Sequence, residues 1–224
     1  MITQLIDKRD NVEIIRDQIA AILCSEVTNQ VKLAKAAHKP WLDRHLHIYT
    51  ERSSPWDDFM SIPDGAKEQP DRLCPIVAVS FENTNYEKAG SDFERQRTVG
   101  IFNIDCYGYG VARDDGGNGH CPGDAQASLN AQRAVRLVRN LLMAAEYETL
   151  KMTGVVSRRW FQSVSMFQPQ IDGRSVERVV AARMALEVTF NEYSPQVEGQ
   201  PLELIAATLR RYETGQVYLV AQYP

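Results

Sequence analysis

Hydrophobic residues recur at helical spacing in two stretches of the chain. The first stretch follows Asp10, which together with Glu13 three residues later resembles a capping box. Its apolar positions predict an amphipathic helix over residues 11–37: Val12, Ile15, Ile19, Ile22, Leu23 and Val27. The second stretch follows Asp124, a residue type suited to an N-cap, and its apolar stripe predicts another helix: Ala131, Ala134, Val135, Val138, Leu141, Leu142 and Ala145.

Between and after these helices the pattern changes to runs of β-branched and aromatic residues, which favour strands. We predict strands over these ranges: 45–50, 76–82, 98–109, 155–168, 178–193 and 216–223. Residues 76–82 and 98–109 predict an antiparallel pair. Within 178–193, hydrophobic residues alternate with polar ones, as expected for a sheet that buries one face: Met184, Leu186, Val188 and Phe190. A short helix is expected over residues 201–211.

This order of elements predicts an α+β fold, a mainly antiparallel sheet with helices packed on one face. With 224 residues, one domain over 1–224 is the simplest expectation. Residues 51–75 contain several prolines and keep neither period, so we interpret them as an extended loop or arm inserted into this domain. Residues 196–224 are expected to form a C-terminal helix-strand extension.

Composition narrows the class of protein. Hydrophobic residues make up 44% of the chain and charged residues 24%, as in ordinary folded proteins. A net charge of -4 gives no general attraction for nucleic acid. No apolar run is long enough to cross a bilayer, no signal peptide is recognisable, and the four cysteines are scattered. We therefore expect a protein with reduced thiols that folds in the cytoplasm and does not bind membranes.

Chemical motifs are weak throughout. His45 and His47 stand two residues apart on an expected strand and would share a face, so they are candidate metal ligands. The 106–121 region adds Cys106, His120 and Cys121, but the spacing is not that of a structural zinc site. The glycine-rich stretch 108–123 lacks a phosphate-binding signature and reads as a flexible loop. We therefore expect no catalytic residue, metal or cofactor, and keep a metal-dependent enzyme as the rival interpretation.

Two groups of residues are candidate interface residues. The first lies in the 51–75 segment and comprises Trp56, Phe59 and Met60, which either anchor a partner or fold back onto their own domain. The second lies on the helix after Asp124 and comprises Arg133, Arg136 and Arg139. These arginines either form a basic contact surface or a solvated helix face with intersubunit ion pairs. Trp160, Phe161 and Phe167 are expected to supply core packing.

Four segments carry a resemblance to a known family: NVEIIRDQIAAIL, TVGIFNIDCYGYG, AQRAVRLVRNLLMAAEYETL and ARMALEVTFNEYSP. Their order, over roughly residues 11–195, resembles the tail terminator and tail-completion proteins of long-tailed bacteriophages. In that family an N-terminal helix, an antiparallel sheet and a middle helix form a subunit of a ring at the head-proximal end of the tail.

The resemblance implies a structural virion protein of the phage neck and no enzymatic activity. It implies a homo-hexameric ring that ends the tail tube, contacts the tube and sheath proteins, and joins the head-tail connector. DNA would pass through its channel without sequence-specific contacts. The protein would be found in the host cytoplasm during assembly and then in the virion. A different neck or connector protein with the same core, and a small-ligand binding module with a closed pocket, remain alternatives.

Overall fold

A computed structural model gives the fold in two compact units. The described residues are 5, 7–60, 73–89, 91, 95–111, 113–114, 120–121, 123–171, 174–175, 178–193, 205–210 and 217–223. One unit, called the main unit below, spans Asp7–Tyr193, and the other combines Met1–Ile6 with Ser194–Pro224. The expected α+β core lies within the main unit, and the expectation of one domain over 1–224 stays a prediction.

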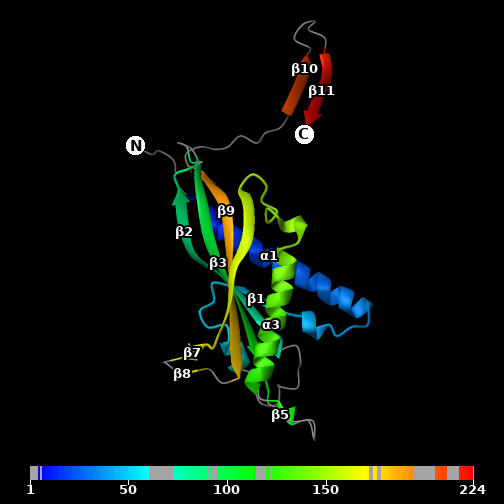
Figure 1. The fold of residues 1–224 in the computed structure, drawn as a ribbon, viewed down its shortest axis with the longest axis vertical. Coiled ribbons are helices and arrows are strands. Elements are labelled where there is room, and N and C mark those ends of the chain that lie inside the picture. Colours follow the sequence, from blue (N-terminus) through cyan, green and yellow to red (C-terminus); the bar gives the residue numbers. More distant parts are fainter. Residues whose placement is uncertain are drawn as a thin grey trace. The chain divides into compact units, whose positions relative to one another are not determined.

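The main unit is an α+β fold built on a five-stranded sheet with the order β1-β2-β3-β9-β6 (Figure 1). The strands are β1 (His47–Thr50), β2 (Ile76–Glu87), β3 (Arg95–Tyr109), β6 (Val156–Phe167) and β9 (Val179–Tyr193). All neighbours are antiparallel except β1 and β2, which run parallel. The predicted pair at 76–82 and 98–109 is confirmed, and both strands extend further into the polar stretch between them.

One face of the sheet, the helix face, is covered by α1 (Asn11–Ala36) and α3 (Gly123–Leu142), as Figure 1 shows in blue and green. Both helices confirm the sequence prediction. The N-cap prediction for Asp124 is wrong, because α3 begins at Gly123 and Asp124 lies in its first turn, where it accepts a hydrogen bond from the backbone N–H of Ala125 at 2.8 Å. The capping-box interpretation of Asp10 is wrong, because its side chain makes no cap and its backbone carbonyl accepts from Glu13 instead. The helix-face core contains the largest buried side chains, among them Ile15, Leu23, Phe102, Leu142, Met184 and Phe190.

Glycines fix how closely α3 lies against β3. A Cβ on Gly108 would stand 2.2 Å from the carbonyl oxygen of Ala127, and one on Gly110 would stand 1.9 Å from the carbonyl oxygen of Gly123. Both distances are far inside van der Waals contact, so only glycine permits this backbone approach. Gly108 lies in β3 and not in a flexible loop, which corrects that part of the loop expected over 108–123.

The opposite face of the sheet carries a smaller core at one end. There α2 (Asp57–Met60) and its flanking residues cover the strands, with Phe59, Ile76, Tyr107, Tyr109 and Val179 at the centre. The expected extended arm over 51–75 is thus partly folded, with Trp56 and Phe59 packed on the sheet and residues 61–72 outside the described part of the chain. The sheet is therefore covered on both faces at this end.

The remaining elements are short. They are η1 (Leu42–Arg44), η4 (Ala145–Tyr147), and the hairpins of β4 (Arg113–Asp114) with β5 (His120–Cys121) and of β7 (Gln170–Ile171) with β8 (Arg174–Ser175). In the C-terminal unit, β10 (Ile205–Arg210) pairs antiparallel with β11 (Val217–Tyr223). The strand expected over 216–223 is confirmed.

The helix expected over 201–211 is wrong, and so is the helix-strand extension over 196–224 that contained it. The helical preference of Leu and Ala is a weak bias, and pairing with a neighbouring strand overrides it. No helix among the described residues is long and apolar enough to span a bilayer.

Candidate functional site

The aromatic residues of the 51–60 segment fold back onto their own sheet. The Phe59 side chain is only 3% exposed, and its ring stacks on Tyr109 with centroids 5.3 Å apart. Trp56 is half-buried beside Tyr107, with centroids 5.5 Å apart. The fold-back alternative therefore describes Phe59, and its role as an exposed interface anchor is wrong, because burial against the sheet leaves no surface for a partner. The side chain of Met60 lies outside the described part of the structure.

A polar cluster holds this segment in place. The guanidinium of Arg52 donates two hydrogen bonds to Asp58, at 2.7 Å and 2.5 Å, and the Tyr49 hydroxyl donates a third at 2.7 Å. The hydrogen bonds from Arg52 are the main cause that lowers the pKa of Asp58 below its usual value. The same cluster raises the pKa of Tyr49, chiefly through its hydrogen bond to Asp58. A two-point arginine–carboxylate contact is specific in geometry, so it fixes the position of Asp58 in α2 relative to Arg52.

The arginines of α3 point into solvent. Arg133, Arg136 and Arg139 are all exposed, on the side of the helix away from the core. Arg133 forms an ion pair with Asp43 of η1 at 3.6 Å, which bridges two elements of the same subunit. The structure thus places these residues together, on a basic helix face that is separate from the aromatic cluster of residues 56–59.

Beside Arg133 the main unit has an open cavity of about 390 Å³. Its wall includes Leu42, Asp43, Cys74, Tyr109, Asn130 and Arg133. This cavity is where the small-ligand alternative would place a ligand. Its rim also includes Leu73 and Val111, each of which borders residues outside the described ranges.

The candidate metal ligands do not converge among the residues whose side chains are described. His45 and His47 do lie together, with ring centroids 5.1 Å apart in an edge-on contact. Cys106, however, is fully buried in the helix-face core, and burial raises the pKa of its thiol, which disfavours the thiolate that binds metals. No cluster of three metal-binding side chains occurs within the described ranges. The side chains of His120 and Cys121 lie outside them.

The strand predicted over 155–168 is confirmed as β6, but its place at the outer edge of the sheet was not predicted. β6 pairs only with β9 in the described sheet, and it exposes large hydrophobic side chains on both faces: Trp160 by 40%, Val164 by 48% and Met166 by 44%. Trp160 is therefore not the core residue that the sequence suggested, and Arg158 stacks over its ring at 4.3 Å. A signal was present, because SRRWFQSVSMF lacks the clean alternation that marks the half-buried β9.

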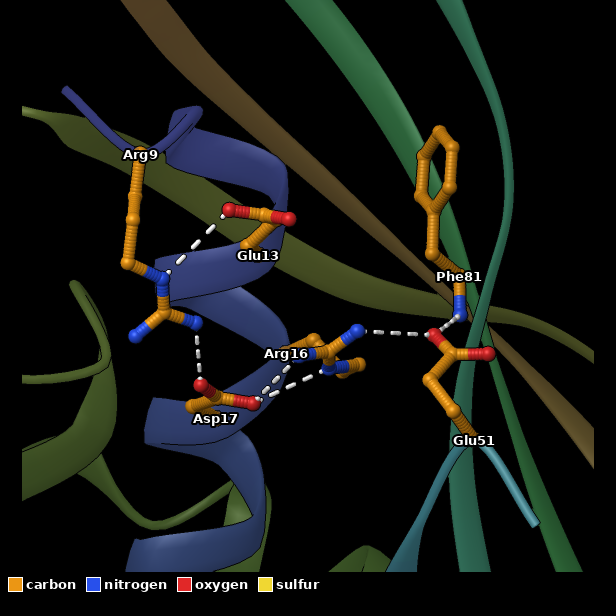
Figure 2. Close-up of polar contacts among 6 residues, drawn as sticks. All are labelled: Arg9, Glu13, Arg16, Asp17, Glu51 and Phe81. Carbon is orange, nitrogen blue, oxygen red and sulfur yellow. Dashed lines mark hydrogen bonds and ion pairs between the residues drawn. The ribbon is translucent and has the colours of Figure 1, made fainter. Parts of the chain in front are cut away.

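At the other edge of the sheet, only part of β2 is paired with a further strand. β1 pairs with Ile76–Val79 and then stops at Thr50. Just past this point, the Glu51 carboxylate accepts hydrogen bonds from the backbone N–H of Phe81 at 3.0 Å and from Arg16 at 3.2 Å (Figure 2). Arg16 also contacts Asp17 at 2.8 Å. Beyond Phe81, residues 82–87 of β2 have no strand beside them on this side in the described sheet, and Tyr86 is 62% exposed.

A charged pair crosses the opposite face between β3 and β9. Arg183 donates to both carboxylate oxygens of Asp105, at 2.8 Å and 2.7 Å, and the Tyr107 hydroxyl donates to the same carboxylate at 3.3 Å. The Asp105 side chain is 7% exposed. Burial is the main cause that raises the pKa of Tyr107, and the neighbouring carboxylate adds to it. The tyrosine therefore stays neutral, and the pair is a structural contact between two strands.

Comparison with known proteins adds no family. No family model matches the chain, and none of the curated proteins compared with it is similar enough to count as a relative. The case for a function therefore rests on the fold and on the surfaces described above.

Proposed function

We propose that this chain is a structural subunit of a bacteriophage neck, which assembles into a hexameric ring that ends the tail tube. The observation that carries the proposal is the edge strand β6, which offers exposed Trp160, Val164 and Met166 beside an open row of backbone hydrogen-bonding groups. An exposed hydrophobic edge of this kind is a template for association with another chain.

The fold adds support through the resemblance. The main unit contains an N-terminal helix, a mainly antiparallel sheet and a middle helix in the order that the tail terminator resemblance implies. Ring formation needs two different surfaces on each subunit, because a head-to-tail interface closes on itself after a fixed rotation. The two edge surfaces of the sheet, along β6 and along β2, are different from each other, as a head-to-tail interface requires.

In this role the ring contacts the tail tube, and the sheath where the phage has one, on one side, and the head-tail connector on the other. DNA passes through the channel without base-specific contacts. The subunit folds in the host cytoplasm and becomes part of the virion.

The solution mass of the purified chain tests this function, measured by size exclusion with light scattering, with negative-stain images of the same sample. The expected result is a hexamer with a central channel. A stable monomer or dimer at every concentration, with a ligand or stoichiometric metal bound, would instead favour the small-ligand module or the metal-dependent enzyme. Metal analysis of the same sample separates these two.

A further inference from the structure

Residues of the two edge strands β6 and β2 lie in the same rows across the sheet. Arg158 of β6 is the register partner of Thr189, Thr189 is the partner of Val99, and Val99 is the partner of Asn85 in β2. Arg158 and Asn85 therefore occupy one row across the sheet and lie on the same face. The first half of β6 is thus level with the outer half of β2, the part that β1 leaves without a neighbour.

The directions of β6 and β2 also suit pairing between two copies. β2, β3, β9 and β6 alternate in direction, so β6 runs opposite to β2. If a second copy continues the sheet in the same sense, β6 of one copy lies antiparallel to β2 of the next. Antiparallel pairing is the more stable arrangement per residue and needs no connecting segment.

Charge complementarity favours this partner over a second β6. The β6 edge carries the exposed Arg158 and the partly buried Arg159, whose guanidinium donates to the carbonyl of Ala144 at 2.7 Å. Two β6 strands would bring these arginines against arginines.

The outer half of β2 carries Glu82 and Glu87, both exposed. Glu87 lies two residues from Asn85 on the same face, so in this register it is the diagonal neighbour of Arg158. It also pairs with Arg97 of its own subunit at 2.9 Å. Glu82 lies at the β2 bulge, one row from the level of Trp160.

Bulges on β6 limit how much of this edge can pair. The β6–β9 register shifts between Val156 and Arg158 and again between Phe161 and Ser163. Between the shifts, Arg158–Phe161 is regular, and this is the run level with the open part of β2. The second regular run, Ser163–Phe167, is level with Ile76–Ser80, most of which β1 already pairs, so Arg158–Phe161 is left as the pairing segment.

We infer that subunits of this protein associate head to tail by strand addition, with the Arg158–Phe161 run of β6 pairing antiparallel to residues 82–87 of β2 in the next copy. This rests on the proposed function in one respect, the closure of the assembly into a ring. Arg158 lies opposite Asn85 and diagonal to Glu87 of the neighbouring edge, and Trp160 is covered in the contact. The partner is a second copy of this chain.

Disulfide trapping tests the contact directly. In the full chain, with Cys24 and Cys121 replaced by serine, the variant Arg158→Cys/Asn85→Cys is oxidised mildly and run on a non-reducing gel. Opposite residues of an antiparallel pair lie about 4.5–5.5 Å apart between Cα atoms, within reach of a disulfide. We expect a ladder of covalent oligomers from the double variant, no ladder from either single variant, and dimers alone from a mixture of the two.

A charge reversal supplies an independent test. Arg158→Glu is expected to lower the fraction of assembled protein at least about 10-fold at a fixed concentration, because it places a carboxylate diagonal to Glu87 of the next copy. The double variant Arg158→Glu/Glu87→Gln is expected to restore part of it, because the like-charge contact is removed. Lys32→Glu on α1 is the matched control, because it makes the same charge change at an exposed helix position that is not a candidate interface residue. Far-UV circular dichroism and melting temperature confirm that each variant is folded.

The outcomes separate this contact from the proposed function. A ring that gives no ladder and is unaffected by Arg158→Glu overturns the edge contact and leaves the ring function standing. A ladder that extends into open fibres supports the edge contact and overturns the closed ring. A folded chain that gives neither assembly nor ladder at the highest concentration contradicts both.

Discussion

The carboxylate of Glu51 accepts a hydrogen bond from the backbone N–H of Phe81 at 3.0 Å, immediately after β1 ends (Figure 2). Glu51 has a left-handed backbone with φ of 48°, while its own N–H still donates to the carbonyl of Val79 at 3.0 Å. The chain thus turns away from the sheet, and a side chain satisfies the next backbone group of β2. Glu51 therefore sets where the closed part of this edge ends.

Replacing Glu51 by alanine should expose the Phe81 amide to exchange. The side chain is partly solvated, so the expected loss in the free energy of unfolding is about 1 kcal/mol. Glu51→Gln keeps a carbonyl acceptor for Phe81 and loses only the ion pair with Arg16. Hydrogen exchange measured by NMR should show faster exchange at Phe81 in Glu51→Ala than in Glu51→Gln, and equal rates in the two variants would contradict the role given to this carboxylate.

Phe59 is expected to matter for folding and not for assembly. Phe59→Ala removes a buried ring from the smaller core and should lower the free energy of unfolding by about 3 kcal/mol. Urea denaturation measures this loss, with the exposed Arg136→Ala as a control expected to stay within about 0.5 kcal/mol. A Phe59→Ala protein of unchanged stability that no longer assembles would restore the interface role.

Acid should weaken the contact that holds the 51–60 segment. The pKa of Asp58 lies below its ordinary value of 3.8 in the folded protein, chiefly because Arg52 donates hydrogen bonds to it. The unfolded chain therefore binds more protons at acidic pH, and the stabilisation, full above 3.8, is lost as the pH falls through the folded pKa. Asp58→Asn should flatten the fall in melting temperature below about pH 4.

The pH test needs a second carboxylate for comparison. Asp17 also has a lowered pKa, mainly from its hydrogen bond with Arg9. Asp17→Asn should therefore also reduce the fall in melting temperature at acidic pH. Its effect should add to that of Asp58→Asn, because the two sites share no partner. If both substitutions leave the fall in melting temperature at acidic pH unchanged, other carboxylates dominate the acid sensitivity.

The pair between Asp105 and Arg183 should be costly to break from one side. Arg183→Met leaves the nearly buried Asp105 carboxylate without its cation, and the expected loss is about 2–3 kcal/mol, since Arg183 itself is half-exposed. Adding Asp105→Asn should recover part of that loss. Chemical denaturation of both single variants and the double variant gives the coupling energy. A coupling near zero would mean that the two strands hold their register without this pair.

Gly108→Ala should be more damaging than its one added carbon suggests. The new Cβ would meet the Ala127 carbonyl and the Ala131 amide, both backbone groups that cannot rotate away. Helix α3 must shift, and we expect a loss of about 3 kcal/mol or an unfolded protein. Gly154→Ala is the comparison, because no atom lies within 4 Å of its Cβ position and its penalty comes from a φ of 87° alone. Thermal melts rank the two.

The helices and long strands could be predicted because each buries one face, so its hydrophobic residues recur with the period of a helix or of a strand. For example, Met184, Leu186, Val188 and Phe190 alternate along β9 and are all fully buried. The short C-terminal strand β10 could not, because Leu and Ala suit a helix as well, and the partner strand that decides the outcome lies further along the chain.

The candidate surfaces were harder to predict than the fold. Whether Trp160 is buried depends on β6 being an edge, and strand order is set by pairings between distant segments that no local pattern records. For Phe59 the sequence left two alternatives open, because no local pattern shows that a segment rich in proline and acidic residues supplies a buried ring once Arg52 and Asp58 fix its position. The arginines of α3 were placed correctly because helical spacing alone puts them on the outer face.

The close contact between α3 and β3 has a mechanical consequence. At Gly108 and Gly110 the backbone of the helix contacts the backbone of the β3 segment directly, with no flexible side chain between them. Such a contact resists both compression and sliding, so helix and sheet respond to an applied load as one stiff body. A force on the exposed arginines of α3 is therefore passed to the strands with little loss, and deformation would concentrate in the loops and at the sheet edges.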